Sequence, residues 1–134
     1  MSTEQTRSLV TEMFERWEHH GDTGPFLSAL ADDLSWTVTG SSPIAGTYDG
    51  KAAYIEGVYQ RLDSRLEHWP VPRVRRIVAD GDWAVVFWRG VDGRGRRGED
   101  YAMDYTWWLR IADGQIREVI GFYDGEKVAA LVAA

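Results

Sequence analysis

Three Asp-Gly dipeptides, at 80–81, 92–93 and 113–114, separate four runs of β-forming residues in the second half of the chain. The runs cover 71–79, 83–91, 101–111 and 115–123 and are rich in Val, Ile, Trp and Tyr. Asp-Gly between such runs favours tight hairpins, because both residues tolerate the positive φ that these turns require. The second half therefore predicts an antiparallel meander of four strands.

The first half has a different periodicity. Apolar residues recur at helical spacing over 9–17 and 53–66, and a shorter helix is expected to follow Pro25. Residues 34–38 alternate as in a strand with one buried face, and 40–50 is expected to be a loop. A short apolar helix is expected over 127–133, after a last Asp-Gly at 124–125.

This order predicts an α+β roll, in which three helices pack on a curved, mostly antiparallel sheet and a short C-terminal helix follows. At roughly 100–200 residues per domain, the 134 residues are expected to form one domain spanning 1–134.

Composition and charge exclude several function classes. With 15 Lys and Arg, 21 Asp and Glu and no Cys, the chain has no thiol chemistry, and its acidic balance disfavours nucleic-acid and anionic-membrane partners. The basic run 93–98 is short, so we interpret it as a solvated hairpin loop. The three His lack metal-ligand spacing, so no metal or cofactor is expected. Without an apolar span or a signal core, a soluble, cytoplasmic protein is expected.

Aromatic residues are unusually frequent, with seven Trp, six Tyr and four Phe. They indicate either an aromatic core or an aromatic-lined pocket. Strand and helix periodicity predicts an inward-facing set that would bind a small hydrophobic ligand: Phe14, Trp17, Trp36, Val38, Tyr54, Val58, Phe87, Met103, Trp107, Val119 and Gly121.

Two strands are apolar on both faces, which predicts that the second face of the sheet is also covered. We expect Trp88, Thr106 and Trp108 to lie there. A face of this kind is typical of a homodimer interface.

Two stretches, ADDLSWTVTGSSPIAGTYDGKAAY in the first half and WLRIADGQIREVIGFYD in the second, carry a family resemblance. In this order and spacing they resemble the SnoaL-like and ketosteroid-isomerase-like branch of the NTF2-like superfamily, over nearly the whole chain. The resemblance implies a cone-shaped fold around one deep apolar pocket. Members of the family isomerise steroids, cyclise polyketides, open epoxides or only bind a ligand.

The family's catalytic positions carry unsuitable residues in this chain. Ketosteroid isomerase uses an Asp base with an oxyanion hole of a Tyr and a protonated Asp. These positions align with Val38, Phe14 and Trp107, and the inward acid of the SnoaL-type cyclases aligns with Gly121. None of the four can perform the corresponding step.

Other polar residues are therefore the catalytic candidates. Tyr54, Tyr105 or Tyr123 could polarise a substrate oxygen, while Arg89, Asp104 or Asp124 could handle charge. Each charged candidate has a structural alternative. Arg89 would bridge to an acid across the sheet, Asp104 would face outward, and Asp124 would cap the last helix.

Two functional hypotheses follow. The first is a SnoaL-like enzyme that isomerises, cyclises or ring-opens a polycyclic, polyketide-like or steroid-like substrate. The second is a non-catalytic ligand-binding or dimeric assembly module with the same fold.

Overall fold

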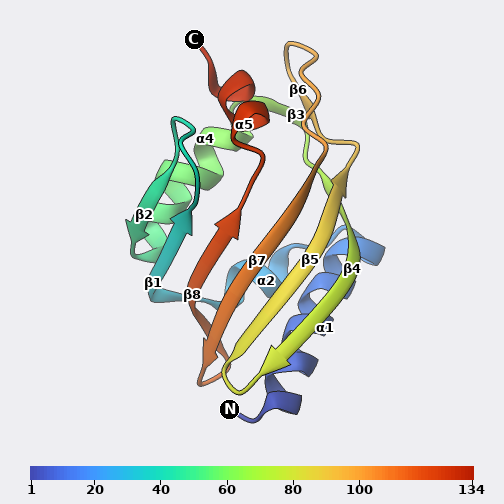
Figure 1. Ribbon diagram of the computed structural model, residues 1–134, viewed down its shortest axis with the longest axis vertical. Coiled ribbons are helices and arrows are strands. Elements are labelled where there is room, and N and C mark those ends of the chain that lie inside the picture. Colours follow the sequence, from blue (N-terminus) through green and yellow to red (C-terminus); the bar gives the residue numbers. More distant parts are fainter.

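The computed structural model describes all 134 residues and contains one large sheet with helices on one of its faces (Figure 1). The six strands lie in the order β2-β1-β8-β7-β5-β4. Their bounds are β1 Leu30–Val38, β2 Gly46–Asp49, β4 Val71–Asp80, β5 Trp83–Val91, β7 Met103–Ala112 and β8 Gln115–Phe122. Neighbouring strands are antiparallel, except β1 and β8, which are parallel. The predicted α+β fold is confirmed.

The helices cover one face and one end of the sheet. Helix α1 (Thr3–His20) packs on β4 and contacts α2 (Gly24–Ala29). A longer helical segment, made of α3 (Lys51–Tyr54), η1 (Ile55–Tyr59) and α4 (Gln60–Asp63), contacts β1 through α3. Helix α5 (Gly125–Val132) lies at the end of the sheet near the small β3–β6 pair, Leu66–His68 with Arg94–Gly95 (Figure 1). None of these helices combines the length and the apolar character needed to cross a membrane.

Two local expectations differ from the structure. The predicted loop 40–50 contains β2, which pairs with β1 although Gly46 and Asp49 are weak strand formers. The Asp92–Gly93 turn does not close a tight hairpin but opens a longer connection that contains β6. The other two dipeptides lie at tight two-residue turns: Gly81 and Asp82 join β4 to β5, and Asp113 and Gly114 join β7 to β8.

A π turn interrupts the third helical segment. Such single-turn bulges occur often at functional sites. Gly57 lies within it, where a Cβ would come to 2.5 Å from the Tyr48 Cε2 atom. Glycine therefore lets this segment approach β2 closely.

The side chains of β5 point to the opposite faces of the sheet from those predicted. Trp88 is buried at 1% exposure, whereas Phe87 is 38% exposed on the uncovered face. Arg89 lies on the same uncovered face and is half-buried. The expectation that Trp88 faces outward, and Phe87 and Arg89 inward, is wrong. Both faces of this strand carry apolar residues, so a period of two does not determine which face is buried.

This register predicts that two adjacent substitutions lower the free energy of unfolding by very different amounts. Trp88→Ala should destabilise the protein by about 3–5 kcal/mol, because it leaves a cavity in the core. Phe87→Ala should cost clearly less than Trp88→Ala, because it removes no side chain from the core. Urea unfolding of both variants measures the difference, and equal costs would contradict the register.

Candidate functional site

A cavity of about 310 Å³ lies between the helices and the inner face of the sheet. Most of its deep lining is aromatic or aliphatic and buried: Phe26, Tyr54, Val58, Leu62, Trp88, Tyr101, Tyr105 and Trp107. The mouth is marked by lining residues that reach the surface: Gly21, Thr23, Leu27, Tyr59, Trp69 and Val71. Trp17, Pro70 and Tyr123 complete the wall. The volume suits a small organic ligand.

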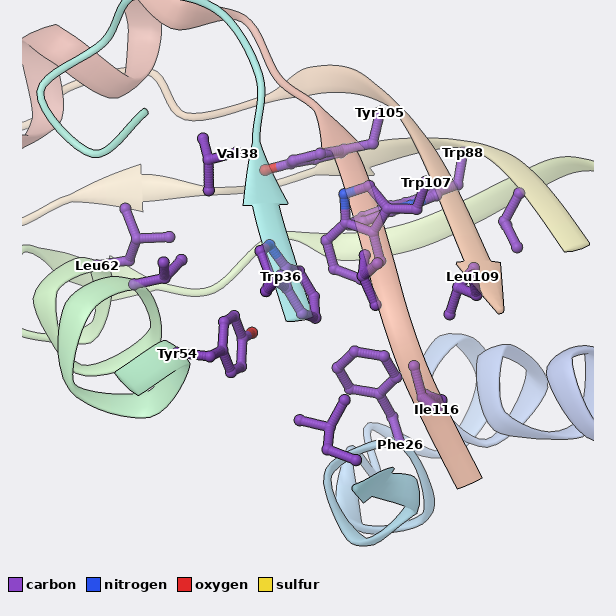
Figure 2. Packing of buried hydrophobic residues seen from close by; sticks show 14 of the residues in the cluster. Phe26, Trp36, Val38, Tyr54, Leu62, Trp88, Tyr105, Trp107, Leu109 and Ile116 are labelled. Atoms are coloured by element: carbon purple, nitrogen blue, oxygen red, sulfur yellow. The ribbon is translucent and has the colours of Figure 1, made fainter. Parts of the chain in front are cut away.

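Stacked aromatic pairs fix the walls (Figure 2). Trp88 and Tyr105 face each other across β5 and β7, with ring centroids 4.0 Å apart and planes at 12°. Trp36 on β1 stacks on Tyr54 of α3, also at 4.0 Å. Trp107 meets the Trp88 ring edge-on at 5.0 Å. Contacts of this kind add stability beyond area burial and restrict ring motion.

Gly121 explains how Tyr123 fits into the wall. A Cβ at this position would lie 2.7 Å from the Tyr123 Cε1 atom and 3.2 Å from the Trp107 Nε1 atom. Position 121, which was predicted to correspond to the acid of SnoaL-type cyclases, therefore has no room for any side chain while these two rings occupy their places.

Tyrosine hydroxyls and indole N–H groups lie in and behind the wall of the cavity. Tyr123 is engaged, since its hydroxyl accepts a bond of 3.2 Å from the Trp36 indole. The Tyr101 hydroxyl and the indole N–H groups of Trp88 and Trp107 are buried with no partner. These three groups are enclosed within the wall, so a ligand in the cavity does not reach them.

The ionisable groups of the cavity are all tyrosines, because no Asp, Glu, Lys, Arg or His lines it. Burial raises the pKa of Tyr54, Tyr101, Tyr105 and Tyr123. Neighbouring tyrosines reinforce the increase at Tyr105 and Tyr123. The hydroxyls therefore stay protonated near neutral pH. They can donate hydrogen bonds, but they cannot act as proton-abstracting bases.

The charged catalytic candidates lie outside this cavity. Arg89 and Asp104 form an ion pair of 3.4 Å on the outer face of the sheet. Asp124 is the N-cap of α5 and accepts bonds from the backbone N–H groups of Glu126 and Lys127 at 3.1 and 3.3 Å. The structural alternative therefore holds for each of the three, and the expectation that Arg89 faces the ligand is wrong.

The predicted inward residues divide into two groups. Trp17, Tyr54, Val58 and Trp107 line the cavity, as do the catalytic candidates Tyr105 and Tyr123. The remaining inward residues are buried in the packed core behind the lining: Phe14, Trp36, Val38, Met103, Val119 and Gly121. Phe87 lies outside both groups, on the opposite face.

Sequence reasoning missed much of the mouth. Trp69 and Pro70 precede β4 in a connection without periodicity, so no pattern indicated their facing. Trp69 stacks on Tyr59 with centroids 5.0 Å apart, and its indole donates a bond of 2.6 Å to Asp63. No group of three or more His, Cys, Asp or Glu side chains is arranged to hold a metal ion.

Comparison with known proteins defines the family. The SnoaL-like domain family matches residues 10–119, and the chain belongs to this family. An NTF2-like protein from Burkholderia thailandensis aligns over 100% of both chains at 21% identity, with a TM-score of 0.77. No curated protein matches the sequence significantly.

Two further solved structures share the fold. TerC, co-crystallised with polyporic acid, aligns over 96% of this chain and 98% of its own, at 19% identity and a TM-score of 0.71. A candidate SnoaL-like polyketide cyclase from Mesorhizobium loti aligns over 87% and 97%, at 20% identity and a TM-score of 0.70. At these identities the likeness establishes the fold alone.

The raised tyrosine pKa values predict that stability falls at alkaline pH. Above the ordinary Tyr pKa of about 10, the unfolded chain loses protons that the folded chain keeps. The free energy of unfolding therefore decreases as pH rises through that region. Urea unfolding across this range should show the decline, and Tyr123→Phe should reduce its slope. If tyrosinate absorbance shows every tyrosine ionising at its ordinary pKa in the folded protein, this explanation fails.

Proposed function

We propose that the protein binds a flat, hydrophobic, carbonyl-bearing molecule of the polyketide or steroid kind in its aromatic cavity. It promotes cyclisation or isomerisation by polarising the carbonyl oxygen rather than by supplying a base. The supporting observation is the donor set. Every polar side chain deep in the cavity can donate a hydrogen bond, and none is charged near neutral pH.

The chemistry of the walls narrows the ligand class. Flat rings fit between the stacked aromatic side chains. A carbonyl oxygen accepts bonds from hydroxyl and indole donors, whereas a ligand cation offers them no acceptor. A fully ionised carboxylate would be buried without a counter-cation, at a large desolvation cost. A neutral carbonyl therefore fits best, and the co-crystallisation of TerC with polyporic acid supports a small organic ligand.

Carbonyl polarisation is the catalytic contribution that this cavity offers. A hydrogen bond that strengthens as the oxygen gains negative charge lowers the barrier, and the tyrosines keep their protons while it forms. The walls would also hold a flexible substrate folded for ring closure. A proton leaving carbon would have to pass to water, since the cavity contains no carboxylate or imidazole.

Binding without turnover is the second candidate function. The same observation favours it, because a positioned base or acid typically contributes about 10²–10⁴-fold to a rate and the cavity contains no ionised one. Both candidates share the binding step and differ only in rate acceleration.

A matched pair of probes tests the binding step. We expect 9-fluorenone and fluorene to quench tryptophan fluorescence as they enter the cavity, because they share a flat skeleton. Tyr105→Phe should lower the affinity for 9-fluorenone by about tenfold, since it removes one hydrogen bond. The affinity for fluorene should be nearly unchanged. Tyr48→Phe is the matched control, since Tyr48 donates to the Ile44 carbonyl outside the cavity. If neither probe binds, or if Tyr105→Phe affects both equally, the proposal fails.

Ring closure of 1,4-dibenzoylbutane then separates the two candidates. Its α-carbon, after losing a proton to water, bonds to the second carbonyl carbon, whose oxygen takes up a proton. An enzyme should accelerate this closure, and Tyr105→Phe should reduce the acceleration by a factor of about ten or more. A wild-type protein that binds the diketone without accelerating closure would support the binding function.

We further propose that the outer face of the sheet binds a second copy of this chain. Phe87, Trp108 and Phe122 are 38%, 43% and 47% exposed there. Phe87, Thr106 and Phe122 are directly paired across the neighbouring strands β5, β7 and β8. The Arg89–Asp104 ion pair on the same face gives each copy both signs of charge. A self-complementary patch of this kind suits a two-fold dimer.

Trp108→Asp should convert the dimer to a monomer, because it places a charge at the centre of an apolar interface. Light scattering after size-exclusion chromatography measures the mass. Thr11→Asp, on the exposed side of α1, is the control and should leave the mass unchanged. Retained 9-fluorenone binding by the monomer would show that it is folded, and a monomeric wild-type protein would contradict the proposal.

A further inference from the structure

Trp69 is the largest side chain at the mouth of the cavity. It lines the cavity and is only half-buried, so its ring is open to a ligand that extends to the mouth. An indole offers such a ligand a broad, flat surface. The ring can influence which ligand binds if the protein holds it in one position.

Two contacts fix the Trp69 side chain against the helical side of the mouth. Its ring stacks on Tyr59 of η1, with centroids 5.0 Å apart and planes at 22°. Its indole N–H donates a bond of 2.6 Å to the Asp63 carboxylate at the end of α4. The stack restricts the tilt of the ring, and the hydrogen bond restricts its rotation. The ring is therefore in place before a ligand arrives, so binding does not have to order it.

The backbone on either side of Trp69 is held by separate contacts. Before it, β3 pairs with β6, where Leu66 lies opposite Gly95. After it, Pro70 packs against β5, where a Cβ at Gly90 would come to 2.8 Å from the Pro70 Cβ atom. Glycine at position 90 therefore lets the connection lie close to the sheet.

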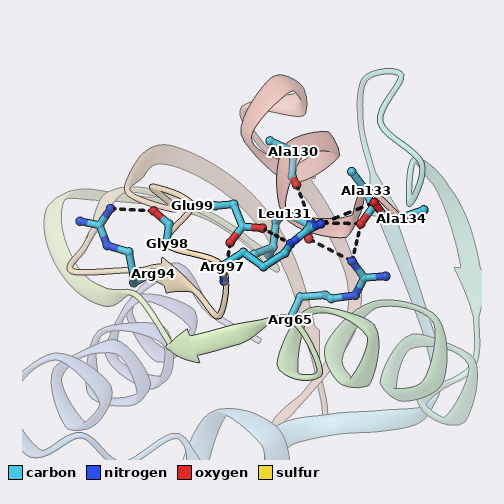
Figure 3. Close-up of polar contacts among 9 residues, drawn as sticks. All are labelled: Arg65, Arg94, Arg97, Gly98, Glu99, Ala130, Leu131, Ala133 and Ala134. Atoms are coloured by element: carbon cyan, nitrogen blue, oxygen red, sulfur yellow. Dashed lines mark hydrogen bonds and ion pairs between the residues drawn. The ribbon is translucent and has the colours of Figure 1, made fainter.

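The β3–β6 pair is in turn fastened to the last turn of α5 (Figure 3). Arg65, just before β3, donates to the Ala133 carbonyl at 2.6 Å. Arg97, two residues after β6, donates to the carbonyls of Ala130 and Ala133 at 3.4 and 3.1 Å. Cationic side chains suit the carbonyl end of a helix. Part of the basic run 93–98 thus helps to anchor the segment from which the mouth connection starts.

We propose that Trp69 is a specificity-determining residue that selects ligands whose flat ring system extends from the carbonyl group to the mouth, with Asp63 as the positioning residue that orients its indole. The inference rests on the function proposed above and deepens it by naming the shape of the ligand. With the carbonyl oxygen at Tyr105, deep in the cavity, rings fused in line reach outward, and the outermost ring packs on the indole. Such an aromatic contact stabilises beyond the area it buries.

Two ketones that differ by one ring test this selection. 2-Acetylnaphthalene and 2-acetylanthracene both carry the carbonyl group at one end, and the second is longer by one fused ring. Equilibrium dialysis measures both affinities without relying on tryptophan fluorescence. The wild-type protein should favour the longer ketone by about tenfold, and Trp69→Ala should reduce this ratio of affinities by about five- to tenfold. Trp83→Ala, which removes an indole outside the cavity, is the matched control and should leave the ratio unchanged.

Substitutions at Asp63 test its positioning role. Asp63→Leu removes the acceptor and should reduce the ratio by about three- to fivefold, because the ligand must then order the freed indole. Asp63→Asn keeps an oxygen that can accept the indole N–H, so it should retain most of the wild-type ratio. Combining Asp63→Leu with Trp69→Ala should lower the ratio no further than Trp69→Ala alone, because the carboxylate acts through the indole. If Trp69→Ala does not fold, Trp69→Leu replaces it, since leucine keeps an apolar side chain but has no flat ring.

The outcomes separate this inference from the proposed function. Equal affinities of the wild-type protein for the two ketones, or an unchanged ratio in Trp69→Ala, would overturn the selection by Trp69. Additive effects of Asp63→Leu and Trp69→Ala would show that Asp63 does not act through the indole. In each case, binding of 9-fluorenone that depends on Tyr105 would leave the proposed function standing. Failure of the wild-type protein to bind 9-fluorenone and fluorene would overturn the proposed function itself.

Discussion

The pairing of β5 with β7 determines which chemistry reaches the cavity. In the observed register, Trp88 lies against Tyr105, and Arg89 lies against Asp104 on the other face. Because side chains alternate along a strand, a shift of β5 by one residue would bring Arg89 inward and expose Trp88. The absence of charge from the cavity and the burial of the stacked rings are thus consequences of one register.

An uncharged, aromatic cavity changes the behaviour of its tyrosines. In water a phenol loses its proton near pH 10, but burial raises the pKa of Tyr105 and Tyr123 well above that value. The cavity therefore offers neutral donors over the physiological range. A cation such as Arg89 inside it would oppose the increase, since a nearby positive charge favours the phenolate. Excluding charge keeps these hydroxyls as donors.

The sequence predicted where the strands lie in the chain better than which face of the sheet their side chains occupy. The Asp-Gly turns and the β-rich runs located β4, β5, β7 and β8 to within a few residues, because turn chemistry is local. The facing of β7 was predicted correctly, but that of β5 was not, since Val85 and Phe87 are as apolar as Val86 and Trp88. The mouth residue Trp69 lies in an irregular connection, where contacts with Tyr59 and Asp63 fix its position. Such long-range contacts leave no periodic signal in the sequence.

The lack of an acid at position 121 has a steric cause in two neighbouring aromatic residues, Tyr123 and Trp107. Gly121 leaves room for the Tyr123 ring and for the nearby Trp107 indole nitrogen, and the Tyr123 hydroxyl accepts its bond from Trp36. A carboxylate at 121 would displace the Tyr123 ring and place a negative charge among buried aromatic side chains, which carries a large desolvation cost. An acid introduced by substitution at 121 alone would therefore disrupt the wall of the cavity. A change of mechanism at this site requires Gly121 and Tyr123 to change together.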